Sequence, residues 1–374
     1  MSVTSDDGRR VPERILAAAP GEDPCGAGAS LASRAAPPGA AAGAQAARRA
    51  GLRADRVAAG AAELRLRLAD GVRRGLAGEE GTGRSAWDGV AARMVDAQAP
   101  GLASRVRELA AVPASGPDWP GRLLEEYALL DLLAAAYGRV DRLPAPLAAT
   151  VRSRVGFTVE AAEVLRTVPA VRDRWLVLGA HDTADERLAT RRLWLRGTAT
   201  GRIALLLSHG RAGRAADLSL PVGLVVEADL AYHPGARPLR AVLGPGAGPP
   251  APPVPGGGVP PGVTVGGAMA EYGAALAGDP WLDSWPVVLA DVVPVPGPEG
   301  WRLADGDGDG DGGDGEGGGW IPVHAPGSAA GPGLWRLAAV SGGRPVTVFG
   351  ECGHRGFAPV TVWDADGIPT GLRT

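Results

Sequence analysis

The spacing of apolar residues changes at Pro169, and this change constrains the fold more than any other feature of the sequence. Before it, apolar residues separated by arginines and acids recur at spacings near four, beginning with Leu52, Val57, Leu64, Leu68, Val72 and Leu76. After it, short apolar runs such as Trp175–Leu178 alternate with Gly, Thr and Asp, a pattern typical of strands joined by turns. The sequence therefore predicts an α+β fold. We expect an N-terminal all-helical domain, followed by a mainly antiparallel β region that forms either a meander or a barrel-like sheet.

Five further helices are expected between Leu76 and Pro169. They run from Ser85 as N-cap to Pro100, through Val106 and Leu109, from Leu123 to Tyr137, from Pro146 to Val155, and from Thr158 as cap through Leu165. The helix from Leu123 to Tyr137 is apolar almost all round, which is typical of a central and buried helix.

The second half of the chain is expected to consist of strands with one short helix around Tyr272. The predicted strands contain Trp175–Leu178, Leu193–Leu195, Ile203–Leu207, Pro221–Asp229, Val287–Val293, Trp301–Leu303, Leu334–Val340, Val346–Phe349 and Val360–Trp363. The expected segments are a disordered tail over residues 1–50, a helical domain over 51–168, an antiparallel β region over 169–242, a Pro/Gly linker over 243–262, and a β-rich region over 263–374. The last includes a disordered Asp/Gly loop at 305–319.

The 374 residues include no lysine and no asparagine, which excludes several chemistries. A Walker A loop, a Schiff base and a Ser-Lys mechanism all need a lysine, and arginine does not replace it because its guanidinium stays protonated. The Asp305–Glu316 run fits the spacing of an EF-hand loop, but the flanking sequences are not helical, so we interpret it as a hairpin tip. We expect no cofactor.

The net charge of −3 gives no global preference for nucleic acid or membrane, although the charge is uneven. Residues 47–108 hold twelve arginines against eight carboxylates. An alternative function, nucleic-acid binding, would use the arginine-rich helices of the first half of the chain, with these candidate residues: Arg48, Arg49, Arg53, Arg56, Arg65, Arg67, Arg73 and Arg74. After Arg9-Arg10 the N-terminus has no apolar run, so no signal peptide and a cytoplasmic location are predicted.

Cys352 and His354 form a Cys-x-His pair, and the other cysteine, Cys25, lies more than three hundred residues away. Structural zinc sites are built from four ligands, so this pair supplies only half a site, and we expect no bound metal. If the strand from Val346 continues, alternation places Val346, Val348, Cys352 and His354 on one face. That pattern favours a buried thiol beside a half-exposed imidazole. A metal half-site and a Cys-His catalytic dyad remain the alternatives.

Six stretches together resemble a known family: AAELRLRLADGVRRGLAG, ARMVDAQAPGLASRVREL, VRDRWLVLGAHDTADERLATRRLWLRG, ALLLSHGRAGRAADLSLPVG, DPWLDSWPVVLADVVPVPG and GLWRLAAVSGGRPVTVFGECGHRGFAPVTVW. Over about residues 52–365 the chain is similar to the region downstream of the finger in bacterial SWIM zinc finger family proteins. The finger itself is absent, because residues 1–51 contain Cys25 as their only thiol and no histidine. The resemblance implies protein partners, with a MoxR-type AAA ATPase or a von Willebrand A-domain protein as examples.

These observations favour a non-enzymatic interaction or accessory protein that acts in a larger protein assembly and not at a membrane. The alternatives are the arginine-based nucleic-acid-binding protein and a metal or thiol enzyme centred on Cys352 and His354.

Overall fold

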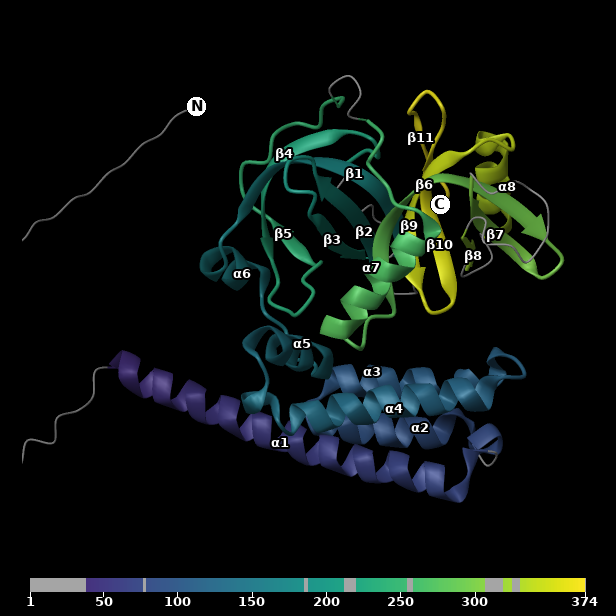
Figure 1. The fold of residues 1–374 in the computed structure, drawn as a ribbon. Helices are drawn as coiled ribbons and strands as arrows, with labels where there is room; N and C mark the ends of the chain where they lie inside the picture. Colours follow the sequence, from purple (N-terminus) through teal and green to yellow (C-terminus); the bar gives the residue numbers. More distant parts are fainter. Residues whose placement is uncertain are drawn as a thin grey trace, which may run out of the picture. The chain divides into compact units, whose positions relative to one another are not determined.

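The computed structural model describes residues 38–76, 79–184, 188–211, 220–253, 258–306, 319–324 and 330–373, and has the predicted α+β fold (Figure 1). A helical region is followed by two open antiparallel sheets. Residues 51–374 form one compact unit by their contacts. No helix in the described ranges is both long and apolar enough to cross a membrane.

The helical region consists of α1 (Pro38–Arg74), α2 (Glu79–Asp96), α3 (Pro100–Leu109), α4 (Trp119–Tyr137), α5 (Ala145–Val155) and α6 (Ala161–Thr167). Two 3-10 turns, η2 (Val112–Ser115) and η3 (Val140–Arg142), follow α3 and α4. Gln98 adopts a φ of 61°, which reverses the chain after α2, and Pro100 starts α3, where its missing N–H is harmless. The helices bury an apolar core in which Trp87 and Tyr127 meet edge to face, with ring centroids 5.7 Å apart.

Several helix boundaries differ from the predictions. Residues 38–50, expected in a disordered tail, are helical because the alanines there favour helix strongly. Ser85 lies inside α2, which already begins at Glu79, and α6 starts after Glu160, so Thr158 is not its N-cap. The part of the predicted tail before residue 38 lies outside the described residues.

The prediction that α4 is a central and buried helix is only partly correct. Its stripe from Leu123 to Tyr137 is buried, but Leu124 and Leu132 are exposed. On α1, Leu52 and Val72 are also exposed, although the apolar spacing placed them with the core residues. Leucine favours helix wherever it lies, so an apolar side chain alone does not identify the buried face.

The first sheet contains β1 (Val171–Ala184), β2 (Leu188–Gly197), β3 (Ile203–Arg211), β4 (Val225–Tyr232) and β5 (Ala241–Leu243) in the order β3-β2-β1-β4-β5. The predicted meander is correct for β1 to β3, whereas β4 returns to the other side of β1 and pairs antiparallel with it. The sheet is open, so the barrel-like alternative is wrong.

The second sheet contains β6 (Ser284–Gly297), β7 (Gly300–Asp305), β8 (Trp320–Pro322), β9 (Val346–Gly353), β10 (Gly356–Trp363) and β11 (Pro369–Gly371) in the order β11-β10-β9-β6-β7-β8. Helix α7 (Val265–Gly278) confirms the predicted short helix, and the Thr264 side chain caps it by accepting a hydrogen bond from the Gly267 N–H.

The predicted strand over Leu334–Val340 is wrong, because this segment lies in helix α8 (Ala330–Ser341). Leu334 and Leu337 are buried while Trp335 is exposed. A spacing of three between buried leucines fits a helix, and the alanines, leucines and arginine of the segment are helix formers.

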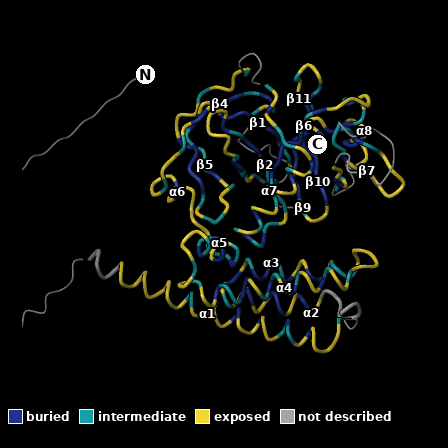
Figure 2. The backbone as a smooth tube through the Cα atoms, viewed as in Figure 1, coloured by how far each residue is buried: buried dark blue, intermediate teal, exposed yellow. Residues whose placement is uncertain are grey.

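The two sheets meet through a shared core that contains Leu176, Leu178, Trp194, Phe349 and Val360. β10 is buried along its whole length, because one face packs in this shared core and the other in the second sheet's own core (Figure 2).

The predicted Pro/Gly linker is attached to the first sheet in its described part, and the residue that follows it is attached to the second sheet. Ala251 pairs with Val225 of β4, and Val263, just after the linker, exchanges backbone hydrogen bonds with Val288 and Ala290 of β6. We call residues 258–262 the strap. Of the predicted Asp/Gly loop, residues 307–318 lie outside the described residues. Asp305 accepts hydrogen bonds from the N–H groups of Val265 and Gly319, so its carboxylate joins β7 to the start of α7.

Candidate binding cleft

The segment Asp279–Asp283, between α7 and β6, joins the β region to the helical region. Trp281 is only 6% exposed and belongs to the core of the helical region, where its indole N–H donates to the Leu129 carbonyl at 2.9 Å. Ion pairs lie on both sides of it: Arg154 contacts Asp279 at 2.9 Å, and Arg105 contacts Asp283 at 3.1 Å. These contacts hold α3, α4 and α5 against the start of β6.

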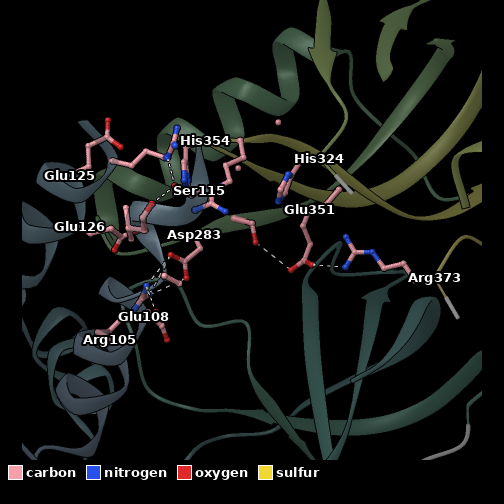
Figure 3. Close-up of a pocket in the computed structure, with 18 residues that line it drawn as sticks. Arg105, Glu108, Ser115, Glu125, Glu126, Asp283, His324, Glu351, His354 and Arg373 are labelled. Carbon is pink, nitrogen blue, oxygen red and sulfur yellow. Dashed lines mark hydrogen bonds and ion pairs between the residues drawn. The ribbon is translucent and has the colours of Figure 1, made fainter. Parts of the chain in front are cut away.

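A cleft of about 520 Å³ lies beside this junction (Figure 3). Its two sides come from different parts of the chain. One side is formed by α3, η2 and α4 together with Asp283, and the other by the β9–β10 hairpin together with His324 and Arg373. The volume falls in the range of roughly 300–1,000 Å³ that is usual for ligand pockets.

The helical wall of the cleft carries an excess of negative charge. Four carboxylates accompany two guanidinium groups there: Arg105, Glu108, Arg122, Glu125, Glu126 and Asp283. Arg122 is held by Ser115 Oγ and the Gly116 carbonyl, at 2.9 and 3.1 Å. Arg105 contacts both Asp283 and Glu108 (Figure 3). Partial burial raises the pKa of Glu108; the charges of Asp283 and Glu126 add to this rise, and Arg105 opposes it.

The hairpin wall has the opposite excess. It consists of His324, Glu351, His354, Arg355 and Arg373, with Arg192 behind it. Glu351 accepts contacts from Arg373 at 3.7 Å and from Ser284 Oγ at 3.4 Å (Figure 3). It also accepts a contact from Arg192 at 3.2 Å. The side chains of Glu351 and Arg373 are only 13% and 17% exposed. The Glu351 carboxylate is thus shared by two guanidinium groups, those of Arg192 and Arg373. Arg355 adds a third guanidinium group to this wall, and it has no ion-pair partner in the described part of the chain.

The histidine His324 belongs to this positively charged wall. Its backbone N–H donates to the Phe357 carbonyl, which ties it to β10. Burial lowers the pKa of His324, and the neighbouring Arg355, Arg373 and His354 lower it further. The imidazole is therefore held in its neutral form over a wider pH range than a free histidine.

The structure separates the two residues of the Cys-x-His pair. Cys352 is 1% exposed and lies in the core of the second sheet opposite Phe357, where burial raises the pKa of its thiol. His354 lies in the turn after β9, exposed to the cleft. The predicted alternation is correct for Val346, Val348 and Cys352 but wrong for His354, because the strand ends at Gly353. In the parts of the chain that the structure describes, no group of three or more His, Cys, Asp or Glu residues could hold a metal ion.

Three of the eight arginines predicted for nucleic-acid binding have contacts within the helical region. Arg53 lies over the Phe157 ring and donates to the Gly156 carbonyl, Arg65 donates twice to Asp131, and Arg73 pairs with Asp70. The other five make no hydrogen bond or ion pair with described residues: Arg48, Arg49, Arg56, Arg67 and Arg74.

Of the cleft residues, only His354 was singled out by the sequence. The others are distributed from Arg105 to Arg373, and each belongs to a different local pattern. The sequence analysis missed the junction, although the stretch DPWLDSWP offers a signal for it, a tryptophan between two aspartates in front of a strand. A buried tryptophan with acidic neighbours is well suited to dock against arginine-bearing helices.

The helices of the cleft's helical wall lie between Leu52 and Val155. No curated protein and no solved structure matches the chain. The helices from Leu52 to Val155 do match a family model. The resemblance to the region downstream of the finger in SWIM zinc finger family proteins is therefore confirmed for residues 52–155, which match the model described as the SWIM-associated four-helix bundle domain.

Proposed function

We propose that this chain is a non-enzymatic interaction protein that holds a segment of a partner protein in the cleft and acts as an accessory in a larger assembly. The observation that carries the proposal is the cleft itself, because its two walls have opposite charge excess. Complementary charges steer a partner and fix its register, so such a cleft selects a segment by its charge pattern.

The expected occupant is an extended segment with charged side chains on both edges. A basic side chain would face Glu125 and Glu126, which make no ion pair with described residues, and an acidic side chain would face Arg355. The resemblance to SWIM zinc finger family proteins makes a MoxR-type AAA ATPase or a von Willebrand A-domain protein the first partners to test.

The proposal is tested by co-purification with tagged chains in cells that naturally produce the protein. The cleft variant carries Glu125→Lys and Glu126→Lys, and the matched control carries Asp88→Lys and Asp96→Lys, two exposed positions on α2 outside the cleft. Each double change adds the same charge. We expect the wild type and the control to recover the same partner, and the cleft variant to lose it by about tenfold or more, as for a lost charge contact at an interface. Equal recovery by all three chains, or turnover of a substrate that depends on cleft residues, would contradict the proposal.

A second candidate function, nucleic-acid binding, is favoured by the arginines of α1 that have no partner among described residues. Arg56, Arg67 and Arg74 are 11 and 7 residues apart, about three and two helical turns, so they lie on one face. A mobility-shift titration with duplex DNA and single-stranded RNA tests it. Binding should weaken steeply with salt and be lost when the three arginines become alanine. No shift at low salt would remove this candidate.

A further inference from the structure

A second cavity, of about 510 Å³, lies under the strap and shares no lining residue with the cleft. Its floor is the face of the first sheet that packs toward the second, where Leu176 and Val225 belong to the shared core. The turn Thr198–Gly201 after β2 forms one side, and Val259, Pro260 and Pro261 of the strap form another. We call this cavity the strap pocket.

Two guanidinium groups are the only charged side chains among the described residues that line the strap pocket, and one of them is Arg196. Its Nη1 donates to the Pro261 carbonyl at 3.0 Å, and no other hydrogen bond or ion pair to it is found in the described ranges. A guanidinium group has five N–H donors, so most of its donor capacity is unused. Arg196 is half-buried, and this burial lowers its pKa against the opposing effect of Glu271. Glu271 makes no ion pair with Arg196 in the described ranges, although a partly buried charge is normally paired.

The second guanidinium group is that of Arg174 on β1. The strand register places Arg174 opposite Glu227 on β4, but Glu227 accepts a 2.6 Å contact from Arg172. The neighbouring Asp173 is also occupied, because its carboxylate accepts hydrogen bonds from the Arg174, Ala199 and Thr200 N–H groups and from the Thr200 hydroxyl. Both nearby carboxylates are therefore occupied by other donors. The Arg174 side chain makes no ion pair with any residue that the structure describes.

We propose that the strap pocket binds a small molecule that carries an anionic oxygen head group, a carboxylate or a phosphate, on an apolar body. The head group would lie between Arg174 and Arg196, whose planar donors match carboxylate and phosphate oxygens. The body would lie against Leu176, Val225 and Val259. This inference is independent of the function proposed for the cleft.

Isothermal titration of the full chain with four eight-carbon probes tests the inference: octanoate, octyl phosphate, octylammonium and octyl glucoside. All have the same apolar body and differ in the head group. We expect at least one of the two anions to bind, with the tighter of them identifying the head group, and the cationic and neutral probes to bind at least about tenfold more weakly. If neither anion binds, or octylammonium binds as tightly as the anions, the inference is overturned.

The variants Arg174→Gln and Arg196→Gln identify the site of binding. Each should weaken binding of the anion by about tenfold, the usual loss for one charge-assisted contact. Arg196→Gln also removes the contact with the Pro261 carbonyl, which would disturb the strap. Arg174 is exposed and makes no contact with the strap carbonyl, so Arg174→Gln tests the site without that disturbance. The matched control is Arg166→Gln on α6, an exposed position outside the pocket that should leave binding unchanged. Wild-type affinity in Arg174→Gln would overturn the inference.

Discussion

Replacing Trp281 with alanine should destabilise the protein more than the loss of any exposed tryptophan, because this side chain connects the β region to the helical core. Trp281 is 6% exposed, its ring packs in the helical core, and its indole N–H donates to the Leu129 carbonyl at 2.9 Å. Large-to-small changes at buried aromatic positions cost about 3–5 kcal/mol, and the unpaired carbonyl adds to that cost. The expected loss in the free energy of unfolding is about 4 kcal/mol.

The assay is urea unfolding followed by far-ultraviolet circular dichroism, with two comparison variants. Trp335→Ala removes a tryptophan that is 66% exposed and should cost less than about 1 kcal/mol. Trp281→Phe keeps an aromatic ring in the helical core but loses the hydrogen bond, so its loss should lie between the other two. If Trp281→Ala and Trp335→Ala unfold at the same urea concentration, the junction does not hold the two regions together and the reasoning is refuted.

Three further changes test the packing, the buried charge and the titration of this structure. Arg154→Ala should destabilise the protein by about 3 kcal/mol, because it leaves the Asp279 carboxylate, which is 6% exposed, without its ion-pair partner and with the Trp281 N–H as its remaining donor among the described residues. Adding Asp279→Asn should restore part of this loss in the same urea assay. Gly179→Ala should cost about 1–3 kcal/mol, since its new Cβ would lie 2.7 Å from Val360 Cγ1, whereas Gly273→Ala, with nothing within 4 Å, should be neutral or stabilising; similar urea midpoints for the two would count against the packing of the sheets. The pKa of His324 is lowered from its ordinary value of 6.5, so the folded chain binds fewer protons than the unfolded chain just below that pH, and the free energy of unfolding should fall as the pH drops below about 6.5 and level off below the folded-state pKa. Urea unfolding at about pH 8 and about pH 5 should show a smaller drop for His324→Gln than for the wild type, and an equal drop would contradict the role of this histidine.

The change of apolar spacing at Pro169 was enough to predict the helices that precede it, most strands and the α+β class. The apolar spacing failed where a segment has many apolar residues but its residues favour helix. The segment around Trp335 is as rich in large apolar residues as the predicted strands. Its buried leucines, however, are three residues apart, and the segment forms α8. β5, β8 and β11 have three residues each, too few to show an alternation of two.

The cleft could not be predicted because its charges are brought together by the fold and not by a motif. Glu351 looks like an ordinary polar residue of a half-buried strand, and only the tertiary structure brings Arg192 and Arg373 to it. The Cys-x-His pair was conspicuous in the sequence, but the turn after Gly353 places its two residues in different surroundings. Sequence spacing therefore identified one cleft residue, His354, without its chemical context.

Site-specific photo-crosslinking from the cleft tests the central claim most directly. A photoreactive amino acid at Ala111, an exposed residue of the helical wall, would be compared with the same amino acid at Asp88 on α2. The proposed function predicts that Ala111 crosslinks to one defined protein segment carrying both basic and acidic side chains, and that Glu125→Lys with Glu126→Lys abolishes this crosslink. Crosslinking from Asp88 but not from Ala111, or a crosslink from Ala111 that the charge reversal leaves intact, would contradict it.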